Sequence, residues 1–479
     1  MPARPKDVRP REPLNTLFIF ADQLHAFGLG CTGSMDAKTP NLDALASKGL
    51  LFTNCYSVAP ICTPYRACLY TGRYASQNGT LHNNDPIFPG ERTLADALEE
   101  GGVATSYVGK WHLGASGSCA VPQEFRGGFR RFIGYQCYND YLDTVEFYDE
   151  DNTKHVRNNH RTDATTDIAI ERLEELRGKR FHLSVSYQNP HYPEQPSPEF
   201  DALFKDAVMA RRPNSREIDP YTRTISPPRS GSSDPTWQRY HDDLNEYLRL
   251  YNAMVAQLDA NVGRLLAALE SFGMADTTAV FFSSDHGDMQ GSQGMRNKCS
   301  FHEESAKVPF IAYVPGGVGG LLSDGLCSTV DLMPTLLDAA RLPAEPTCEG
   351  RSLLPRLLGE AGAALNAAAP ALNAAAPAPN AVAPAPDVVF SEDDNQGSWF
   401  MIRDKRWKLA VNRSDLGPTN FYDMVYDPFE MSNLADALLS KDSGYGPRSP
   451  QRIAFDTLRR RLGEMLEDMR KRRNPALKG

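Results

Sequence analysis

The sequence lacks a long apolar run, an excess of basic residues and any paired-cysteine motif. Without roughly 20 consecutive apolar residues, no membrane-spanning helix is expected. The formal net charge of −9 disfavours a nucleic-acid-binding protein, because such proteins usually present a basic face. An anionic small substrate stays compatible with this charge, since a few cations in a cleft outweigh a diffuse surface charge. With 479 residues, the chain is long enough for one large domain and a smaller one.

The nine cysteines are scattered, without the CxxC spacing of many zinc sites. A large core needs no disulfides, so we expect most of them to be buried thiols. The first 13 residues are basic and proline-rich, and no apolar signal segment follows them. We therefore expect a cytoplasmic protein by default, or a periplasmic or secreted one if a signal has been removed.

Short apolar runs alternate with helical patterns. A long helix is predicted from the three- and four-residue spacing of apolar residues between Trp237 and Leu265, and another after Asp331. This alternation predicts an α/β fold with a large, mostly parallel sheet sandwiched by helices. The predicted strands are Leu17–Phe20, Ala104–Val108, Leu183–Tyr187, Ala279–Phe282 and Pro309–Val314.

Four of these five strands run directly into polar clusters. The clusters read ADQ, GKWHLG, QNPHYP and SDHGD, in chain order. Ligands of open α/β sheets bind beyond the carboxyl ends of the strands. We therefore expect the four clusters to form one site.

The second half of the chain predicts three further features. Residues 359–386 are an Ala/Pro-rich linker or loop between a catalytic domain, 1–358, and a C-terminal subdomain, 387–479. The C-terminal subdomain reads as a small antiparallel sheet followed by an amphipathic helix that carries Ile453, Leu458, Leu462, Met465 and Met469. Residues 205–235, rich in Arg, Pro and Ser, are expected to be an insertion loop.

The segment around Cys62 carries most of the chemistry. Thr63 suits a helix cap, Pro64 the first helical position and Gly72 the helix end. Cys62 would then lie at a helix N-terminus, which attracts anions, and Arg66 would add a planar cation one turn later. The alternative is a buried cysteine beside a structural arginine.

The string CTPYRACLYTGR, from Cys62 to Arg73, resembles the signature of the type I sulfatases of the alkaline-phosphatase-like superfamily. In that family the cysteine is oxidised to formylglycine (3-oxoalanine) by a formylglycine-generating enzyme, and the hydrated aldehyde is the nucleophile. The resemblance covers nearly the whole chain. Further segments match in order: FIFADQ, TPNLDAL, GKWHLG, NPHYP, SDHGD, Lys298 ahead of HEES, and DPFEMSNL.

The resemblance implies one divalent metal ion. Its ligands would be Asp22, Gln23, Asp285, His286 and an oxygen of the modified Cys62. Carboxylate and carbonyl oxygens make Ca²⁺ the first choice. Gln23 stands where an Asp is common and His286 where an Asn is common, so Mn²⁺ and Mg²⁺ stay compatible.

The resemblance also implies catalytic roles. Lys110 orients the hydrated aldehyde, and His112 takes a proton from its second hydroxyl. His191 and Lys298 contact the sulfate ester, and one of them protonates the leaving alcohol. Arg66, Lys110 and Lys298 offset charge on the sulfate oxygens.

The expected reaction is hydrolysis of a small-molecule or oligosaccharide sulfate monoester, with a sulfated carbohydrate favoured over an aryl sulfate. His82, Asn84, Arg296 and His302 are predicted to bind the substrate. A phosphonate monoester hydrolase or phosphodiesterase on the same scaffold is the alternative. A non-catalytic binding protein is a second alternative, although the matched catalytic positions show no gap. The oligomeric state leaves no signal in the sequence.

Overall fold

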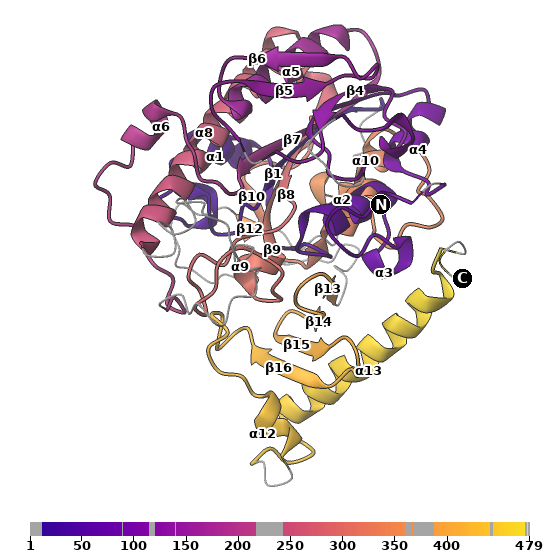
Figure 1. Cartoon of the computed structure of the whole chain (residues 1–479). Helices are drawn as coiled ribbons and strands as arrows, with labels where there is room; N and C mark the ends of the chain where they lie inside the picture. Colours follow the sequence, from indigo (N-terminus) through magenta and orange to yellow (C-terminus); the bar gives the residue numbers. More distant parts are fainter. Residues whose placement is uncertain are drawn as a thin grey trace, which may run out of the picture.

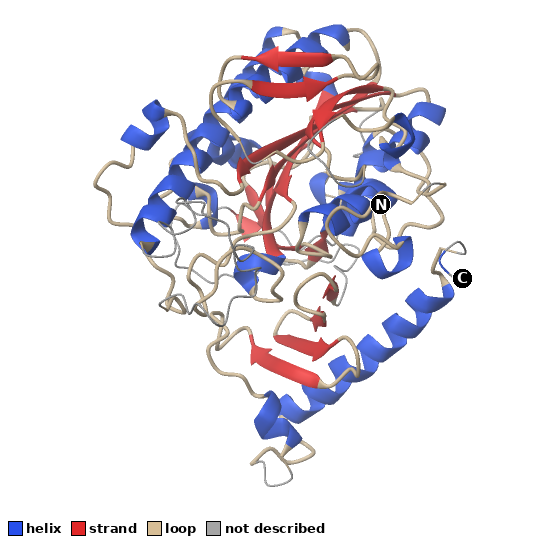
Figure 2. Cartoon of the chain, in the orientation of Figure 1, coloured by secondary structure: helices blue, strands red, loops and turns tan. Residues whose placement is uncertain are grey.

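The computed structural model describes residues 12–88, 90–114, 120–138, 140–216, 243–359, 366–367, 388–440, 444–474 and 477. A large sheet crosses the main body with helices on both sides, and a small antiparallel sheet lies below it (Figures 1 and 2). The long helix α13 runs along the small sheet toward the C-terminus (Figure 1). This arrangement confirms the predicted α/β class and the smaller C-terminal sheet with one helix.

The centre of the large sheet is parallel, in the order β8-β1-β7-β3-β4. These strands are β1 (Asn15–Asp22), β3 (Ala104–Lys110), β4 (Arg131–Tyr135), β7 (Phe181–Pro190) and β8 (Thr278–Ser284). Antiparallel strands extend both edges: β9 (Lys307–Tyr313) and β2 (Leu50–Tyr56) beyond β8, and β5 (Val145–Tyr148) and β6 (Lys154–Arg157) beyond β4. Outside β2 lie β10 (Leu321–Ser323), β11 (Cys327–Ser328) and β12 (Asn366–Ala367).

Alternating residues of β1 supply two separate cores, as expected for a strand buried on both faces. Phe18 and Phe20 pack with α2 (Cys62–Thr71), α4 (Leu94–Glu100) and α10 (Leu332–Ala339). Leu17 and Ile19 pack on the other face with α1 (Pro40–Lys48), α5 (Arg161–Glu175) and α8 (Leu244–Ser271). Shorter helices are α3 (Ala75–Asn78), α6 (Pro198–Ala202), α9 (Glu303–Ala306), α11 (Leu354–Leu357) and α12 (Ala435–Leu439), and 3₁₀ turns are Gly30–Thr32, Gln123–Phe125, Ala275–Thr277 and Thr329–Asp331.

The predicted long helix begins later than the apolar spacing suggested. Helix α8 starts at Leu244, where the Asp243 side chain caps it by accepting from the Glu246 amide. Trp237 and Tyr240, which the prediction included, lie outside the described residues. Most of the predicted insertion loop also lies outside them. No helix of the described part is both long and apolar enough to cross a bilayer.

The C-terminal sheet is a meander of β13 (Val389–Asp393), β14 (Trp399–Arg403), β15 (Trp407–Asn412) and β16 (Pro418–Asp423). Helix α13 (Pro450–Lys471) covers it and buries Phe455, Leu458, Leu462, Leu466 and Met469. The prediction was wrong for Ile453, which is exposed because it lies off this stripe. Within the predicted linker, Asn366–Ala367 pair with β10, and most of the rest lies outside the described residues. The predicted domain boundaries stay predictions.

A buried ion cluster joins the small sheet to the main body. Lys408 of β15 donates to Glu303 and to Glu430, each at 2.8 Å. Arg403 of β14 also lies 3.2 Å from Glu303. Close by, the Trp399 indole donates to the Cys299 carbonyl at 3.0 Å. The small sheet therefore holds the segment that follows Lys298.

Glu430 should make stability depend on pH. Burial raises its pKa to about 7 from an ordinary value of 4.5, with Lys408 opposing and Glu303 adding to the shift. Between these values the folded protein binds more protons than the unfolded chain, so the free energy of unfolding falls as pH rises. In urea unfolding, the free energy of unfolding of Glu430→Gln should fall less between pH 5 and pH 8 than that of the unchanged protein. The difference between the two falls should be up to about 3 kcal/mol. The exposed Glu464→Gln is the control, and identical slopes in all three proteins would contradict the account.

Candidate active site

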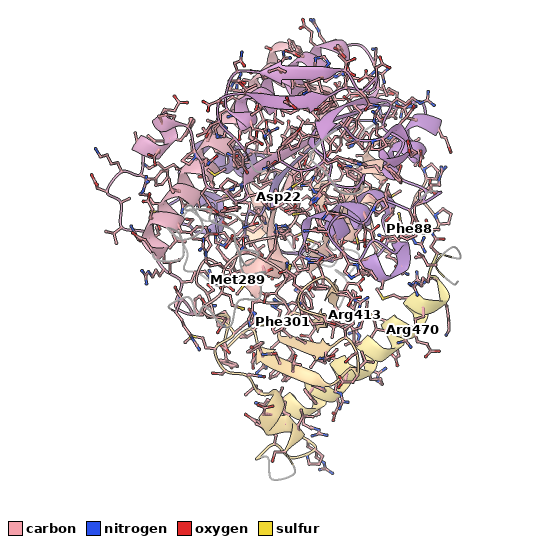
Figure 3. All side chains as sticks on the ribbon, viewed as in Figure 1. Asp22, Phe88, Met289, Phe301, Arg413 and Arg470 are labelled. Atoms are coloured by element: carbon pink, nitrogen blue, oxygen red, sulfur yellow. The ribbon has the colours of Figure 1, made fainter. Side chains whose placement is uncertain are left out.

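The sheet register places two carboxylates side by side. Ala21 of β1 pairs with Ser284 of β8, and Asp22 and Asp285 follow immediately at the ends of these parallel strands. The Asp285 amide donates to the Ala21 carbonyl at 3.1 Å, which continues the pairing past Ser284. Both side chains are fully buried near the middle of the molecule, where Figure 3 labels Asp22.

Cys62 lies at the N-terminus of α2, as predicted, and Gly72 ends the helix with a left-handed φ of 65°. The predicted cap was wrong. The N-cap is Ile61, in extended conformation, and Pro64 is the third helical residue. Thr63 lies inside the first turn, where its hydroxyl donates to the His112 carbonyl at 2.9 Å. It therefore ties the helix to the loop after β3.

Four of the five residues predicted to bind metal converge, and Gln23 is the fifth. One donor atom from each of Asp22, Cys62, Asp285 and His286 lies within 4.8 Å of all the others. His286 Nε2 is 3.3 Å from Cys62 Sγ, 3.4 Å from Asp285 Oδ1 and 3.6 Å from Asp22 Oδ1. A single ion at this point would be within reach of all four side chains.

Each of the two carboxylates, Asp22 and Asp285, directs one oxygen to Arg66 and the other to His286. Their Oδ2 atoms lie 3.0 Å (Asp22) and 3.3 Å (Asp285) from Arg66 Nη2, so the Oδ1 atoms face His286. His286 Nδ1 lies 3.1 Å from the Gly287 carbonyl, an arrangement in which Nδ1 carries the hydrogen and Nε2 offers its lone pair. Two carboxylate oxygens and a neutral imidazole fit a divalent cation.

Two lysines face the sulfur of Cys62. Lys298 Nζ lies 3.2 Å from Sγ, and Lys110 Nζ lies 3.9 Å from Sγ and 2.6 Å from Asp22 Oδ2. Burial alone would raise the pKa of the Cys62 thiol, but Lys110, Lys298 and His286 hold it well below its ordinary value. The site therefore stabilises negative charge at position 62.

Two further histidines border the thiol. Burial lowers the pKa of His112, whose Nε2 lies 3.2 Å from Asn84 Oδ1. Burial, followed by Lys298 and Lys110, lowers the pKa of His191 to about 4. His191 Nδ1 lies 2.6 Å from the Tyr192 carbonyl, so the hydrogen on Nδ1 leaves Nε2 as the acceptor. The lowered pKa of each ring favours its neutral form, and both rings interact with Cys62.

The four residues predicted to bind substrate contact different partners. Asn84 contacts His112, whereas His82 is half-exposed and lies 3.3 Å from Asp85. The guanidinium of Arg296 lies 4.3 Å from the centre of the Tyr247 ring. His302 contacts Ser300 at 2.6 Å and packs on Phe301, which lies at the junction with the small sheet (Figure 3). Their substrate roles stay predictions.

The sequence prediction assigned no role to two residues that support the site. Ser186 of β7 accepts from Arg66 Nη1 at 2.8 Å, and nothing in its apolar strand marked it. Asp288 accepts from Gln23 Nε2 at 2.5 Å. Asp288 is the last residue of the SDHGD segment, and its place in that segment was the sequence signal that could have indicated a role in the site.

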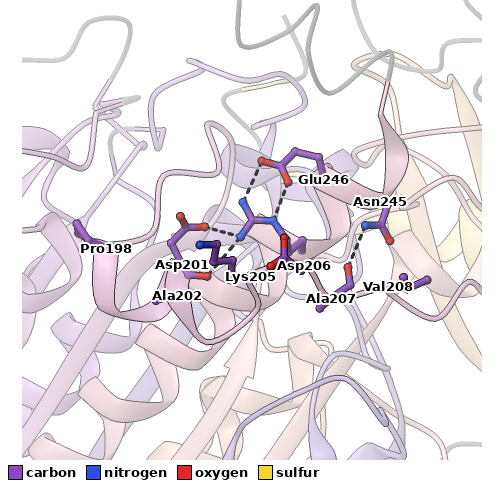
Figure 4. A pocket seen from close by; sticks show the side chains of 10 residues that line it. Pro198, Asp201, Ala202, Lys205, Asp206, Ala207, Val208, Asn245 and Glu246 are labelled. Carbon is purple, nitrogen blue, oxygen red and sulfur yellow. Dashed lines mark hydrogen bonds and ion pairs between the residues drawn. The ribbon is translucent and has the colours of Figure 1, made fainter.

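A hollow elsewhere on the surface is unrelated to this cluster. It has a volume of about 570 Å³ and is lined by α6 and the start of α8, including Asp201, Glu246 and Arg249 (Figure 4). Its lining contains none of the residues predicted for the site. Arg249 is already paired with Glu246 at 2.6 Å and with Asp201 at 2.5 Å.

Comparison with known proteins gives the family. A family model described as Sulfatase matches residues 14–342, which include every residue predicted for the site. The chain belongs to the sulfatase family. It is therefore a sulfuric-ester hydrolase by class, as the resemblance around Cys62 predicted.

A sequence relative agrees with this assignment, and two solved structures share the fold. An ulvan-active sulfatase of Formosa agariphila is 31% identical over 437 residues, covering 89% of this chain and 77% of that protein. A solved structure in complex with its substrate D-glucosamine-2-N,6-O-disulfate superposes with a TM-score of 0.78 at 23% identity, covering 96% of this chain and 99% of the other. The fold is shared with a phosphonate monoester hydrolase from Silicibacter pomeroyi, with a TM-score of 0.71, 22% identity and 97% of each chain covered.

Binding of a divalent ion should stabilise this sulfatase, because the cluster is assembled only in the folded state. At a Ca²⁺ concentration 100 times its Kd, the gain is about 2.7 kcal/mol, and the thermal midpoint should rise accordingly. Asp285→Asn should lose most of this rise, since it replaces a carboxylate of the cluster. Thermal unfolding with Ca²⁺ or with a chelator measures the effect.

The matched control is Asp276→Asn, an exposed position of a 3₁₀ turn. It should respond to Ca²⁺ like the unchanged protein. An equal response from Asp285→Asn would contradict a metal site at the cluster.

Proposed function

We propose that this sulfatase hydrolyses a sulfate monoester of a carbohydrate, with formylglycine made from Cys62 as nucleophile. One observation carries the proposal, the setting of Cys62. This residue begins a helix and belongs to the cluster of possible metal ligands, and its Sγ atom lies within 3.9 Å of two lysine ammonium groups. That combination suits a nucleophile that attacks an anionic ester. The carbohydrate preference is supported by two similar proteins, the ulvan-active sulfatase and the protein solved with D-glucosamine-2-N,6-O-disulfate.

Asp22, Asp285, His286 and the carbonyl of Gln23 would hold the divalent ion, Ca²⁺ first and Mn²⁺ or Mg²⁺ as alternatives. When bound, the ion would act as a Lewis acid that polarises the ester and acidifies the nucleophile. Formylglycine would supply a geminal diol, in which one hydroxyl attacks sulfur and the other permits release of sulfate. The thiol of Cys62 is the group that this modification would convert.

The chain's own residues would orient the reactants. Lys110 and Lys298 offset the charge of the sulfate oxygens, and Lys110 also hydrogen-bonds Asp22. Burial lowers the pKa of His112 and favours the neutral ring, which would accept a proton from residue 62. His191 or Lys298 would protonate the leaving alcohol, since both groups lie beside Cys62.

The choice between sulfatase and phosphonate monoester hydrolase activity can be tested directly. The protein, co-expressed with a formylglycine-generating enzyme, is assayed with an aryl sulfate and with an aryl phosphodiester of the same phenol. We expect kcat/KM to be higher for the sulfate, and sulfate release to follow from a panel of sulfated monosaccharides. A higher kcat/KM for the phosphodiester would favour the phosphonate hydrolase instead.

Loss of the nucleophile should abolish turnover without loss of fold. Cys62→Ala should lower kcat by at least about a thousandfold, because removing a nucleophile leaves only binding and electrostatic stabilisation. The control is Cys31→Ala, which changes a partly exposed thiol in the 3₁₀ turn Gly30–Thr32, outside the cluster. Full turnover by Cys62→Ala would exclude residue 62 as the nucleophile.

A further inference from the structure

Gln23 differs from the carboxylates of the site because its two terminal atoms are chemically distinct. Its oxygen can bind a cation, whereas its NH₂ group can only donate hydrogen bonds. A carboxylate would offer an oxygen in either orientation. The use of Gln23 as a ligand therefore requires that the amide be oriented.

The contacts of Gln23 define that orientation. Nε2 donates to Asp288 Oδ2 at 2.5 Å and to Asn297 Oδ1 at 3.0 Å. Oε1 accepts from Lys298 Nζ at 3.0 Å, and the same ammonium lies 3.2 Å from Cys62 Sγ. The carbonyl end of Gln23 therefore faces the side of the site that holds residue 62.

Asp288 accepts hydrogen bonds with both of its carboxylate oxygens. It is fully buried, and Oδ2 accepts from Gln23 and from the Tyr247 hydroxyl, the latter also at 2.5 Å. Oδ1 accepts from the amides of Gln290 at 2.9 Å and Asn297 at 3.1 Å. The Tyr247 hydroxyl and both backbone amides donate to this carboxylate, so the NH₂ group of Gln23 faces it as a further donor.

Rotation of the amide by 180° would be unfavourable at both ends. Oε1 would then face the Asp288 carboxylate and Nε2 would face the Lys298 ammonium. Two charge-assisted hydrogen bonds would be replaced by two repulsive contacts in a buried site. The charges of Asp288 and Lys298 therefore select one orientation.

We propose that Asp288 is a positioning residue that turns the carbonyl oxygen of Gln23 toward the divalent cation. The inference rests on the metal site of the proposed function and adds a residue that acts through a ligand. Residues that orient metal ligands in this way commonly change metal affinity by about 10- to 100-fold when they are replaced.

Asp288 also shapes the segment between Gln290 and Asn297 through its Oδ1 contacts. A purely structural role would therefore also make Asp288→Asn harmful. The two roles can be separated by changing Gln23 as well, because a carboxylate at position 23 offers an oxygen in either orientation. In the double variant Gln23→Glu/Asp288→Asn, the new amide at 288 can donate to the new carboxylate.

The test is calorimetric titration of the chelator-treated protein with Ca²⁺ at pH 8, with Mn²⁺ and Mg²⁺ in parallel. It requires neither turnover nor formylglycine. Asp288→Asn should weaken Ca²⁺ binding about tenfold, and Gln23→Glu should weaken it similarly by opposing two carboxylates. The double variant should return to within about threefold of the unchanged protein. Tyr247→Phe removes the other donor to the same oxygen and should change the affinity much less.

Two results would overturn the positioning role: unchanged affinity in Asp288→Asn, or losses that simply multiply in the double variant. If Asp288→Asn does not fold, Gln23→Glu alone tests the inference. Without an effect of Asp288, the added ligand charge would tighten Ca²⁺ binding, whereas the inference requires weaker binding. Failure of the unchanged protein to bind any of the three ions would overturn the metal site and this inference together. If the unchanged protein binds an ion and Asp288→Asn binds it equally well, only the inference is overturned.

Discussion

The site depends on the double contact of Arg66 with Asp22 and Asp285. Two adjacent buried carboxylates repel each other, and burial raises the pKa of Asp285 to about 6. Arg66 Nη2 lies 3.0 and 3.3 Å from the two side chains, and Nη1 donates to Ser186 and to the Lys110 carbonyl. A buried charge is tolerated only when it is paired and hydrogen-bonded, so this one guanidinium allows two strand ends to present carboxylates side by side. It also turns the other carboxylate oxygens toward His286.

Helix α2 links that electrostatic arrangement to the reaction. Arg66 is four residues after Cys62, so both side chains lie on one face of the helix, with the proposed nucleophile at its positive end. The aromatic stack of Tyr70 on Trp111, with ring centroids 5.4 Å apart, packs the same helix against the end of β3, where Lys110 and His112 lie. Packing in the core therefore determines the distances between groups that act together.

Much of this arrangement could be predicted from the sequence, because the strands are short apolar runs that end in polar clusters. The convergence of Asp22, Lys110 and Asp285 follows from a parallel sheet in which carboxyl ends share one edge. The wrong assignment of Thr63 as a cap arose because Thr-Pro is a common helix start, whereas here the helix begins one residue before Thr63. The role of Asp288 depends on a contact 265 residues away in sequence, which no local pattern reports. Substrate contacts were the least predictable, since they depend on how loops meet.

The central claim is that residue 62 is a formylglycine, and mass spectrometry of one tryptic peptide tests it most directly. Cleavage after Lys48 and Arg66 releases residues 49–66, which contain Cys62 and also Cys55, a buried thiol of β2 that serves as an internal control. In protein co-expressed with a formylglycine-generating enzyme, the account predicts that residue 62 loses sulfur and two hydrogens and gains one oxygen, while Cys55 is unchanged. A plain cysteine at position 62 in active, metal-loaded protein would contradict it.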